Sequence, residues 1–422
     1  MPPAVAHGDG ACDLSSDLQV VCRRGQLVYD VSVELTVGGV TQVAREVLRD
    51  PAAALIDWGA TPLSGGATGE IGLTGGLWKV SGEVESLGHA VPWSAVLKIL
   101  THSEVVVGDY RADRDDPRGF DYWRREADAY ASGLLGDLGE GLLAPRCWRV
   151  DEHDGEVAIW LEELPPDVST WGVERYRLAA AHLGLFNGAY LDGRKMPSRP
   201  WLSRGRIHDW LRGGERGIRG MRTDRRPGLL ASWLSDSSVS RVERLWQRKA
   251  ALLTALTRLP TTLCHHDAHR RNLVAMPWDH GDQTVAIDWA AMGVGQLGEE
   301  LATFVGVTLQ FLDVSMDEAD DFEDASLEGY LSGLRAAGWT GDEAVLRFGY
   351  QAALGLSMGV GAAGTWFAGL VDPATEQLAE RIIGHPADEI AAQWAAMQPY
   401  LLDRGEKALE MLDAGLGLPK AG

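Results

Sequence analysis

The sequence predicts an α+β protein in which a small lobe of antiparallel strands precedes a large, mainly helical lobe. Two observations support this prediction. Between about residue 46 and residue 164, short apolar segments alternate with glycine-containing turns, which is typical of β-strands. From residue 165 to residue 422, apolar residues recur at helical spacing. The length of 422 residues fits two lobes better than one compact domain.

The small lobe is expected over residues 46–164, after an N-terminal extension of residues 1–45. The extension contains a predicted strand pair, LQVVCRRGQLVYDVSVELTV, which turns at Arg24-Gly25. Three strand segments follow it, GEIGLTGGLWKVSGEV, SAVLKIL and EVAIWLEEL. One helix, DYWRREADAYASGLL over residues 121–135, is predicted between the second and the third segment.

Pro165-Pro166 marks the boundary to the helical lobe, which spans residues 165–422. Its clearest helices are LAAAHLGLFNGAYL, VERLWQRKAALLTALTRL and ADEIAAQWAAMQPYLLDRGEKALEML. The segment of residues 350–371 is uncharged and contains the spacing Gly355-xxx-Gly359, which also occurs in membrane helices. Its many glycines and its polar residues favour a buried, close-packed helix pair instead.

Composition and charge exclude some function classes. The formal net charge is −21, from 39 basic and 60 acidic residues, and a general nucleic-acid binder needs a basic surface instead. The start of the chain shows neither the basic nor the apolar region of a signal peptide. The cysteines lack metal-type pairing and indicate a reducing compartment, so a cytoplasmic protein without a membrane segment is expected. They are Cys12, Cys22, Cys147 and Cys264.

Two charged segments allow more than one interpretation. Residues 313–324, DVSMDEADDFED, are acidic, and such a segment is usually the solvated start of a helix. Residues 204–226 contain eight arginines among glycines. They could form a mobile surface insertion, a lid over a phosphate or a weak nucleic-acid arm. The acidic balance of the chain favours the surface insertion.

The segment LCHHDAHRRNLVAM, residues 263–276, contains the most informative polar residues. Two short apolar strands, NLVAM and TVAID, follow Asp267 and are separated by the turn-rich connector PWDHGDQ. A hairpin of this kind returns Asp288, at the end of the second strand, to the vicinity of Asn272. The local pattern therefore brings two carboxylates and an amide oxygen together.

Carboxylate and amide oxygens at one place are typical of a magnesium site whose other ligands are water and substrate phosphates. Asn272 and Asp288 are therefore predicted metal ligands. Asp267 is predicted to orient a hydroxyl group and to accept its proton as the catalytic base. The spacing His265-x-Asp267-x-x-x-x-Asn272 is that of the catalytic loop in phosphoryl transfer.

Two other kinds of site compete for this region. His265 and His269 have the spacing of zinc-protease histidines, but His266 stands where that motif needs a glutamate, and nearby arginines repel a dication. The segment GVGQLG, residues 293–298, has the letters of a dinucleotide-binding loop. No second βαβ strand follows its helix, so the metal-phosphate site is favoured.

A site for the donor phosphates is predicted in the small lobe. Lys98 interrupts the apolar strand SAVLKIL, which indicates either a partner anion or an edge strand facing solvent. Glu126 lies beside the apolar stripe of the next helix and is expected to pair with Lys98. The other residues expected to bind ATP are the turn glycines Gly75 and Gly76 and the backbone from Glu162 to Leu164.

In their order along the chain, these residues resemble the protein-kinase-like two-lobe fold, and more narrowly the aminoglycoside phosphotransferase and choline kinase superfamily. HHDAHRRN and AIDW are similar to the catalytic loop H-G-D-x-H-x-x-N and the metal strand I-D-W of that superfamily. The resemblance covers roughly residues 46–400 and is strongest over residues 265–289. His266 replaces the usual glycine, and Glu300 stands where an aspartate is common. Neither replacement removes a group that the chemistry needs.

The resemblance implies an ATP- and Mg²⁺-dependent kinase that phosphorylates a hydroxyl group of a small molecule, with GTP open as another donor. It implies Asp267 as the base, Asn272 and Asp288 as magnesium ligands, and Lys98 with Glu126 as the phosphate-binding pair.

Acceptors in that superfamily include aminoglycosides, choline, amino sugars, homoserine, thiamine and macrolides. The acidic balance favours an amine-bearing acceptor, which Trp289 and Trp366 could contact, and a sugar-like acceptor is open as well. The alternative is a non-catalytic nucleotide-binding scaffold protein. A kinase acting on proteins is disfavoured, because no D-F-G or A-P-E motif follows Asp288.

Overall fold

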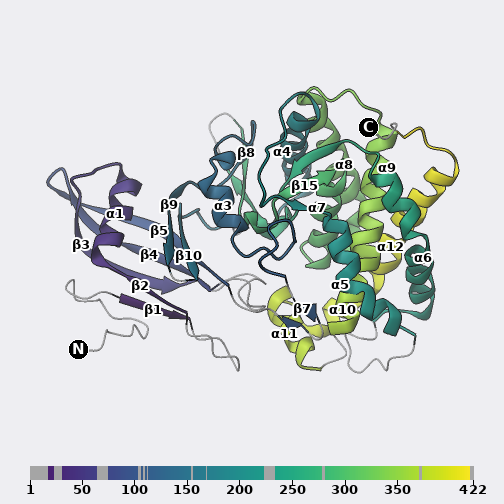
Figure 1. Cartoon of the computed structure of the whole chain (residues 1–422), viewed down its shortest axis with the longest axis horizontal. Helices are drawn as coiled ribbons and strands as arrows, with labels where there is room; N and C mark the ends of the chain where they lie inside the picture. Colours follow the sequence, from purple (N-terminus) through teal and green to yellow (C-terminus); the bar gives the residue numbers. More distant parts are fainter. Residues whose placement is uncertain are drawn as a thin grey trace. The chain divides into compact units, whose positions relative to one another are not determined.

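In the computed structural model the chain divides into two units, and Pro166 is the last residue of the first unit (Figure 1). The sheet unit comprises Met1–Val105, Tyr130–Gly133 and Pro145–Pro166. The helical unit comprises Val106–Ala129, Leu134–Ala144 and Asp167–Gly422. The structure describes residues 18–22, 31–63, 75–102, 106–107, 110–111, 113–153, 155–167, 169–222, 233–277, 281–369 and 373–418.

The sheet unit is built on a five-stranded antiparallel sheet with the strand order β3-β4-β5-β10-β9. Valines and isoleucines suit strands because their branched side chains pack well on a pleated surface. Leu97 and Ile99 of β5 are fully buried and share one core with Val40 and Val43 of helix α1. The elements are β1 (Leu18–Cys22), β2 (Val31–Leu35), α1 (Val37–Leu48), β3 (Ala54–Pro62), β4 (Gly76–Ser86), β5 (His89–Thr101), β9 (Cys147–His153) and β10 (Glu156–Leu161).

The predicted N-terminal strand pair is confirmed, because β1 and β2 pair antiparallel with Leu18 opposite Leu35. The turn predicted at Arg24-Gly25 lies outside the described residues. The sequence does not predict α1, which begins after Thr36, whose hydroxyl oxygen accepts a hydrogen bond from the Gly39 N–H at 3.1 Å. It also does not predict β3 and β9.

The helix predicted over residues 121–135 is shorter in the structure. Helix α3 covers only Arg125–Ala131. Gly133 follows with a φ of 75°, a left-handed conformation that commonly ends a helix. Residues 121–124 precede the helix as turns, and the last two predicted residues belong to a short 3-10 turn, η1 (Leu134–Gly136).

The helical unit confirms the predicted helical character of the second part of the chain. The three helices named from sequence patterns are present as α4, α6 and α12. Its helices are α4 (Val173–Leu191), α5 (Arg206–Gly220), α6 (Asp236–Leu256), α7 (Glu299–Gln310), α8 (Ala319–Ala336), α9 (Glu343–Leu354), η6 (Gly355–Ala362), α10 (Ala363–Gly369), α11 (Pro373–Ile383) and α12 (Ala387–Asp413). Its short elements are β6 (Val106–Val107), β7 (Tyr110–Arg111), β8 (Leu142–Leu143), β11 (Ser203–Arg204), β12 (Thr261–Cys264), η3 (Arg270–Asn272), β13 (Leu273–Met276), β14 (Gln283–Ala286), η4 (Trp289–Ala291), β15 (Gly293–Gln296) and η5 (Met316–Glu318).

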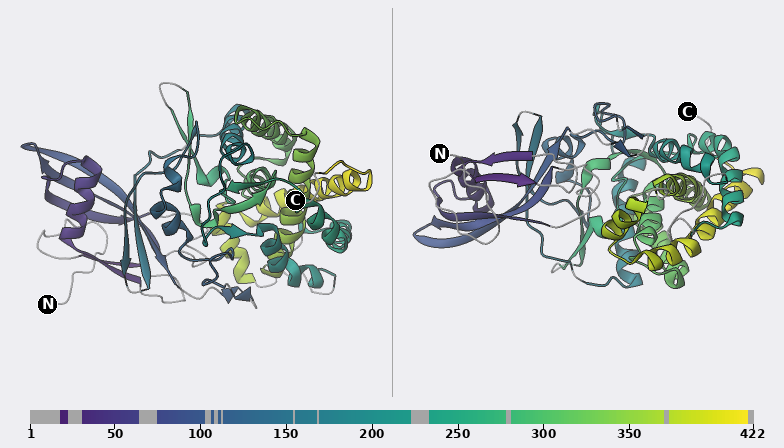
Figure 2. Two further views of the ribbon diagram at one scale, coloured as in Figure 1. Left: turned by 45° about the horizontal axis from the view of Figure 1, so that its top comes forward. Right: turned by 90° about the horizontal axis from the view of Figure 1, so that it is seen from below.

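Helices α4 and α8 lie side by side, and glycines let their backbones approach (Figure 2). A Cβ atom on Gly184 of α4 would lie 2.1 Å from the carbonyl oxygen of Tyr330 in α8. A Cβ atom on Gly333 of α8 would lie 2.0 Å from the carbonyl oxygen of Ala181 in α4. Both distances are far below van der Waals contact, so each position requires glycine.

The uncharged segment packs inside the helical unit over residues 350–367, as the sequence predicts. It contributes the end of α9, the π-helical turn η6 and α10, and all residues of η6 are buried. A Cβ atom on Gly355 would lie 2.3 Å from the Cα atom of Gly405 in α12. None of the described helices is both long and apolar enough to cross a membrane.

The favoured interpretation of residues 204–226 as a mobile surface insertion is wrong for most of the segment. Residues Arg206–Gly220 form helix α5, and Gly214 of this helix packs against the backbone of Gly361 in η6. Residues 223–226 lie outside the described residues. The arginine-rich composition hides an apolar face, because Ile207, Leu211 and Ile218 are buried.

The acidic segment of residues 313–324 is only partly a solvated surface. Glu323 of α8 is 9% exposed and forms an ion pair with Arg404 of α12. Its carboxylate also accepts hydrogen bonds from the hydroxyl groups of Tyr350, at 2.8 Å, and Tyr400, at 2.5 Å. The cluster joins α8, α9 and α12, so this acid has a structural role.

The close packing of α4 and α8 predicts a large effect of one added methyl group. We expect Gly333→Ala to lower the free energy of unfolding by about 2–3 kcal/mol, because the helices must separate. The control is Gly136→Ala, since no atom lies within 4 Å of its added Cβ. Chemical denaturation measures both variants, and equal stabilities would contradict the packing argument.

The buried pair of Glu323 and Arg404 predicts a pH-dependent contribution to stability. Burial raises the pKa of Glu323, but the hydrogen bonds from Arg404 and Tyr400 outweigh it and hold the pKa below 4.5. A folded-state pKa below the unfolded-state value means that the contribution is complete above pH 4.5 and is lost as the pH falls through the lowered pKa.

We therefore expect Glu323→Gln to lower the free energy of unfolding by about 2–4 kcal/mol at pH 7. The difference from the unsubstituted protein should shrink as the pH falls below 4.5. Glu328→Gln is the control on the same helix, because its ion pair with Arg177 leaves the Glu328 side chain 70% exposed. Denaturation at several pH values tests the pair, and a difference independent of pH would count against it.

Candidate active site

The predicted hairpin is present, and its register determines which polar residues lie at its open end. Strands β13 and β14 pair antiparallel with Leu273 opposite Ala286, and the Ile287 N–H donates to the Asn272 carbonyl oxygen at 2.9 Å. The residue after Ile287 is Asp288. The ladder thus brings Asp288 beside the start of β13, as the spacing of the two strands predicts.

Asn272 holds Asp267 through both hydrogens of its side-chain amide. Its Nδ2 donates to the Asp267 carbonyl oxygen at 3.0 Å and to the Asp267 carboxylate at 2.8 Å. Both acceptors are oxygens, so the nitrogen must face Asp267 and the amide oxygen must face away. The Asn272 amide oxygen is therefore available to a cation.

Asp267 combines partial exposure with a raised pKa. Its side chain is 31% exposed. Burial of the loop raises the pKa of Asp267 to about 6, the Arg206 guanidinium opposes this rise, and the Asp288 carboxylate adds to it. Asp288 itself has a left-handed backbone, with a φ of 60° and a ψ of 67°, which is uncommon for a non-glycine residue and frequent at functional sites.

Both histidines of the zinc alternative are engaged in holding the loop. The Nε2 atom of His265 bonds to the Ile287 carbonyl oxygen at 2.9 Å, and its Nδ1 atom accepts from the Asp267 N–H at 3.2 Å. Burial lowers the pKa of His269 to about 4, and its Nδ1 accepts from the Arg271 N–H at 3.4 Å. The hydrogen bonds at both His265 nitrogens leave that ring without a lone pair for zinc.

Glu300 anchors the backbone of the same loop from the first turn of α7. Its carboxylate oxygens accept from the N–H groups of His265, at 2.5 Å, and His266, at 3.1 Å. Burial raises the pKa of Glu300 to about 7, and these two hydrogen bonds oppose the rise. His266 has a φ of 66°, so a residue that replaces the usual glycine adopts the left-handed conformation that glycine tolerates best.

Arg125 is a buried organiser that sequence reasoning missed. Its guanidinium donates only to backbone carbonyl oxygens, including those of Phe120, Trp201 and Ala290, each at 2.8 Å. These carbonyls come from three segments that are distant in sequence. A charged residue in a short helix gives no local signal of such a role, because its partners become neighbours only on folding.

The glycines and the lysine predicted to bind donor phosphates lie on adjacent strands of the sheet unit. Lys98 of β5 pairs with Leu77 of β4 and is 8% exposed. Strand β5 is the middle strand of the sheet, so the alternative of an edge-strand lysine facing solvent is wrong. Gly75 precedes β4 and donates its N–H to the Ile99 carbonyl oxygen at 2.7 Å. Gly76 begins β4, and a Cβ atom there would overlap the Trp78 ring.

The remaining predicted donor-site residues fall in both units. Glu126 is 1% exposed and belongs to the helical unit, whereas Lys98 belongs to the sheet unit. The Glu162 N–H donates to the Arg146 carbonyl oxygen at 2.8 Å. The N–H of Leu164 makes no backbone hydrogen bond within the described part of the chain.

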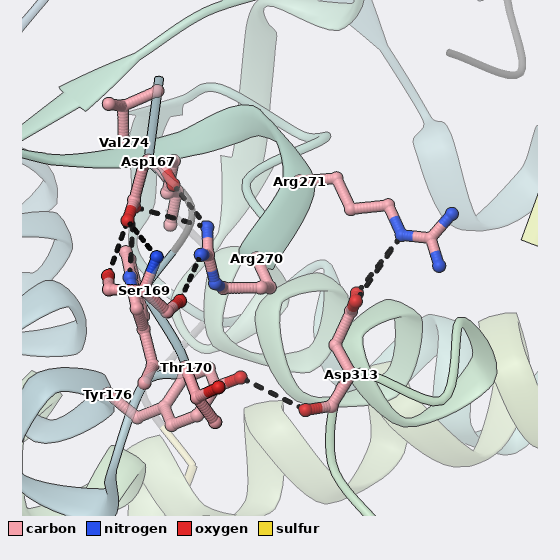
Figure 3. A pocket seen from close by; sticks show the side chains of 10 residues that line it. Asp167, Ser169, Thr170, Tyr176, Arg270, Arg271, Val274 and Asp313 are labelled. Atoms are coloured by element: carbon pink, nitrogen blue, oxygen red, sulfur yellow. Dashed lines mark hydrogen bonds and ion pairs between the residues drawn. The ribbon is translucent and has the colours of Figure 1, made fainter. Parts of the chain in front are cut away.

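A cavity of about 450 Å³ lies against the turn η3, three residues after Asp267 (Figure 3). Both of its acids are already paired, since Arg270 contacts Asp167 and Arg271 contacts Asp313, each at 3.3 Å. The cavity therefore has polar walls with balanced charges. Its lining residues are Asp167, Ser169, Thr170, Trp171, Tyr176, Arg270, Arg271, Leu273, Val274 and Asp313.

The structure bears on the predicted acceptor contact of Trp289 and on the dinucleotide-loop alternative for GVGQLG. Trp289 is fully buried and its indole nitrogen donates to the Ala286 carbonyl oxygen at 2.9 Å, so the prediction that it contacts an acceptor is wrong. The glycines of GVGQLG serve close packing, since a Cβ atom on Gly293 would lie 1.9 Å from the Ser203 hydroxyl oxygen. This explains one glycine of that segment without a dinucleotide.

Comparison with known proteins gives a family match and several solved structures. The profile of the phosphotransferase enzyme family matches residues 204–342, and no curated protein matches the chain. A microcompartment-associated aminopropanol kinase is 16% identical with a TM-score of 0.49, over 86% of this chain and 98% of that chain. Spectinomycin phosphotransferase in complex with ADP and spectinomycin is 13% identical with a TM-score of 0.47, over 83% and 97%. Choline kinase from Cryptosporidium parvum is 13% identical with a TM-score of 0.44, over 86% and 92%.

The anchoring of the loop by Glu300 predicts a loss of stability when this carboxylate is removed. We expect Glu300→Ala to lower the free energy of unfolding by about 2–4 kcal/mol, because two buried N–H groups lose their acceptor. Glu410→Ala, at an exposed position of α12, should change it by less than about 0.5 kcal/mol. Urea denaturation compares the two, and a loss no greater than that of the control would refute the anchoring role.

Proposed function

We propose that this member of the phosphotransferase enzyme family transfers the γ-phosphoryl group of ATP to a hydroxyl group of a small molecule. The single observation that supports it most is the pair of hydrogen bonds from Asn272 to Asp267. They fix a carboxylate and leave an amide oxygen facing away from it, while the β13–β14 ladder brings the backbone of Asp288 beside the start of β13. A base and a cation site side by side are what this reaction requires.

Asp267 is the proposed base. A carboxylate that is 31% exposed can receive a proton from a bound hydroxyl group. Its pKa of about 6 leaves it ionised at neutral pH and makes it a stronger base than an ordinary aspartate. In the reaction, the acceptor oxygen forms a bond to the γ-phosphorus and the bond from phosphorus to the ADP oxygen breaks. The hydroxyl proton passes to Asp267.

Asn272 and Asp288 are the proposed ligands of Mg²⁺. Magnesium prefers hard oxygen ligands, and these two side chains supply an amide oxygen and a carboxylate. The use of Nδ2 for Asp267 fits this role, because only the oxygen of the amide remains. When bound, the ion neutralises charge on the donor phosphates and orients them.

The donor is proposed to bind through the residues predicted from the sequence. Lys98, with Glu126, would hold the phosphates, and Gly75 and Gly76 would allow the backbone to approach them. The burial of Lys98 on a middle strand supports this role, because a buried ammonium group needs an anion. The backbone of Glu162 to Leu164 would hydrogen-bond to adenine, for which the Leu164 N–H is the better candidate.

The acceptor is proposed to be sugar-like or amine-bearing, and the cavity beside η3 is its candidate binding space. Both carboxylates of that cavity are engaged by Arg270 and Arg271, so it has no excess negative charge for a polycation. The Trp171 ring is buried and lies under the guanidinium groups of Arg175 and Arg270, so the surface open to a ligand is mainly polar. A hydroxyl-rich acceptor with few charges is therefore favoured.

The role of Asp267 predicts a loss of turnover when one carboxylate oxygen is replaced by an amide nitrogen. We expect Asp267→Asn to lower kcat by about 10³-fold while ATP still binds, because the amide cannot accept the proton. Asp282→Asn, at an exposed position of the connector between β13 and β14, removes the same charge and should keep full activity. ATP consumption is measured over a panel of sugars, amino sugars, amines and antibiotics with Mg²⁺ present.

Two outcomes would contradict the proposal. Undiminished turnover in Asp267→Asn would remove this residue from the base role. A chain that binds ATP but consumes none with any acceptor in the panel would instead be the nucleotide-binding scaffold protein.

A further inference from the structure

Arg206 is a buried arginine whose guanidinium Nε atom has no hydrogen-bond partner. The residue is 5% exposed, and its Nε atom is buried without a partner. No hydrogen bond or ion pair connects its side chain to any residue that the structure describes. A guanidinium has five N–H donors and is rarely buried unpaired, because the loss of water is then uncompensated. The buried Nε–H of Arg206 is therefore a candidate donor to a ligand.

An aromatic platform holds this guanidinium in place. Its Cζ atom lies 3.4 Å from the centre of the Phe120 ring and 4.9 Å from that of Trp210. The Phe120 backbone is in turn fixed by Arg125, which donates to the carbonyl oxygens of Phe120 and Ala290 from the same nitrogen. Ala290 is the second residue after Asp288. The platform is therefore connected to the segment that carries the proposed metal ligand.

The backbone before Arg206 is tied to that segment as well. Ser203 of β11 donates its N–H to the Met292 carbonyl oxygen at 3.1 Å and its hydroxyl to the Ala291 carbonyl oxygen at 2.8 Å. Helix α5 then begins at Arg206 after Gly205, which has a φ of 79° and provides no side-chain cap. The first N–H groups of α5 thus remain open, and open helix N-termini attract anions.

Four carboxylates act on the charge of Arg206. Burial lowers the pKa of Arg206, and the Asp267 carboxylate opposes this more strongly than Asp209, Asp121 or Glu299 does. Each of these four carboxylates is too distant for an ion pair. The guanidinium therefore lies within electrostatic range of the proposed base without being bound to it.

We infer that Arg206, with the open N-terminus of α5, binds the phosphoryl group during its transfer to the acceptor. This inference rests on the proposed function. In the transfer, the acceptor oxygen bonds to the γ-phosphorus, ADP leaves with its bridging oxygen, and Asp267 takes the hydroxyl proton. Negative charge is then spread over three phosphoryl oxygens beside Asp267. A planar guanidinium can donate two parallel hydrogen bonds to such oxygens.

Binding of inorganic phosphate to the full chain tests the anion site without turnover. Isothermal titration calorimetry should show about tenfold or greater loss of phosphate affinity in Arg206→Met and a smaller loss in Arg206→Lys. The control is Arg219→Met on the same helix, because Arg219 is 74% exposed, and its affinity should not change. Unchanged phosphate affinity in Arg206→Met would overturn the inference.

Kinetics then separate a catalytic role from a structural one. We expect Arg206→Ala to lower kcat by about 10³-fold with little change in the KM for ATP, and added guanidine to restore part of the activity. A structural role would not allow this rescue, and its absence would count against the inference. The thermal midpoint of Arg206→Met should not fall, because an unpaired buried charge is removed. A fall would instead mark Arg206 as structural.

The two proposals fail in distinguishable ways. If the unsubstituted chain shows no turnover with any acceptor but binds phosphate through Arg206, the anion site stands and the proposed function fails. If the chain turns over and Arg206→Lys and Arg206→Met retain both phosphate affinity and kcat, the proposed function stands and the inference fails.

Discussion

A single buried carboxylate holds the backbone on which the candidate active site depends. Glu300 accepts the N–H groups of His265 and His266, and this fixes the loop that presents Asp267. Asn272 then holds the Asp267 carboxylate from the other side. These charge-assisted hydrogen bonds add to the packing of His265 on Trp289 and of His269 on Phe311 in fixing the conformation of the loop.

The helical unit provides the rigid support for this loop through Asn187. Its Nδ2 donates to the Leu263 carbonyl oxygen at 2.7 Å in β12, and its Oδ1 accepts from the Tyr330 hydroxyl at 2.6 Å in α8. The close approach of α4 and α8, which glycines such as Gly184 allow, places these partners within reach. Strand β12 leads directly into the loop. The close packing of α4 and α8 therefore fixes the position of β12 and, through it, the position of Asp267.

Two neighbouring arginines show how burial separates structural from ligand-binding charges. Arg125 donates all its hydrogen bonds to backbone carbonyl oxygens and so compensates its own desolvation. Arg206 has comparable burial and no such partners within the described residues. Among the described residues the Arg206 guanidinium contacts the rings of Phe120 and Trp210 but has no hydrogen-bond acceptor, which a phosphoryl group beside Asp267 would supply. The distinction depends on the partners of each residue, because the residue type and the exposure are the same.

The sequence by itself determined the α+β class, the hairpin of β13 and β14, and the local convergence of Asp267 and Asn272. These features follow from the spacing of apolar and polar residues over short segments, because that spacing determines local secondary structure. Only the tertiary structure decided that Trp289 is buried, that Glu300 anchors the loop, and that Arg206 lacks partners. Those properties depend on which distant segments meet, and packing between distant segments leaves no periodic signal in the sequence.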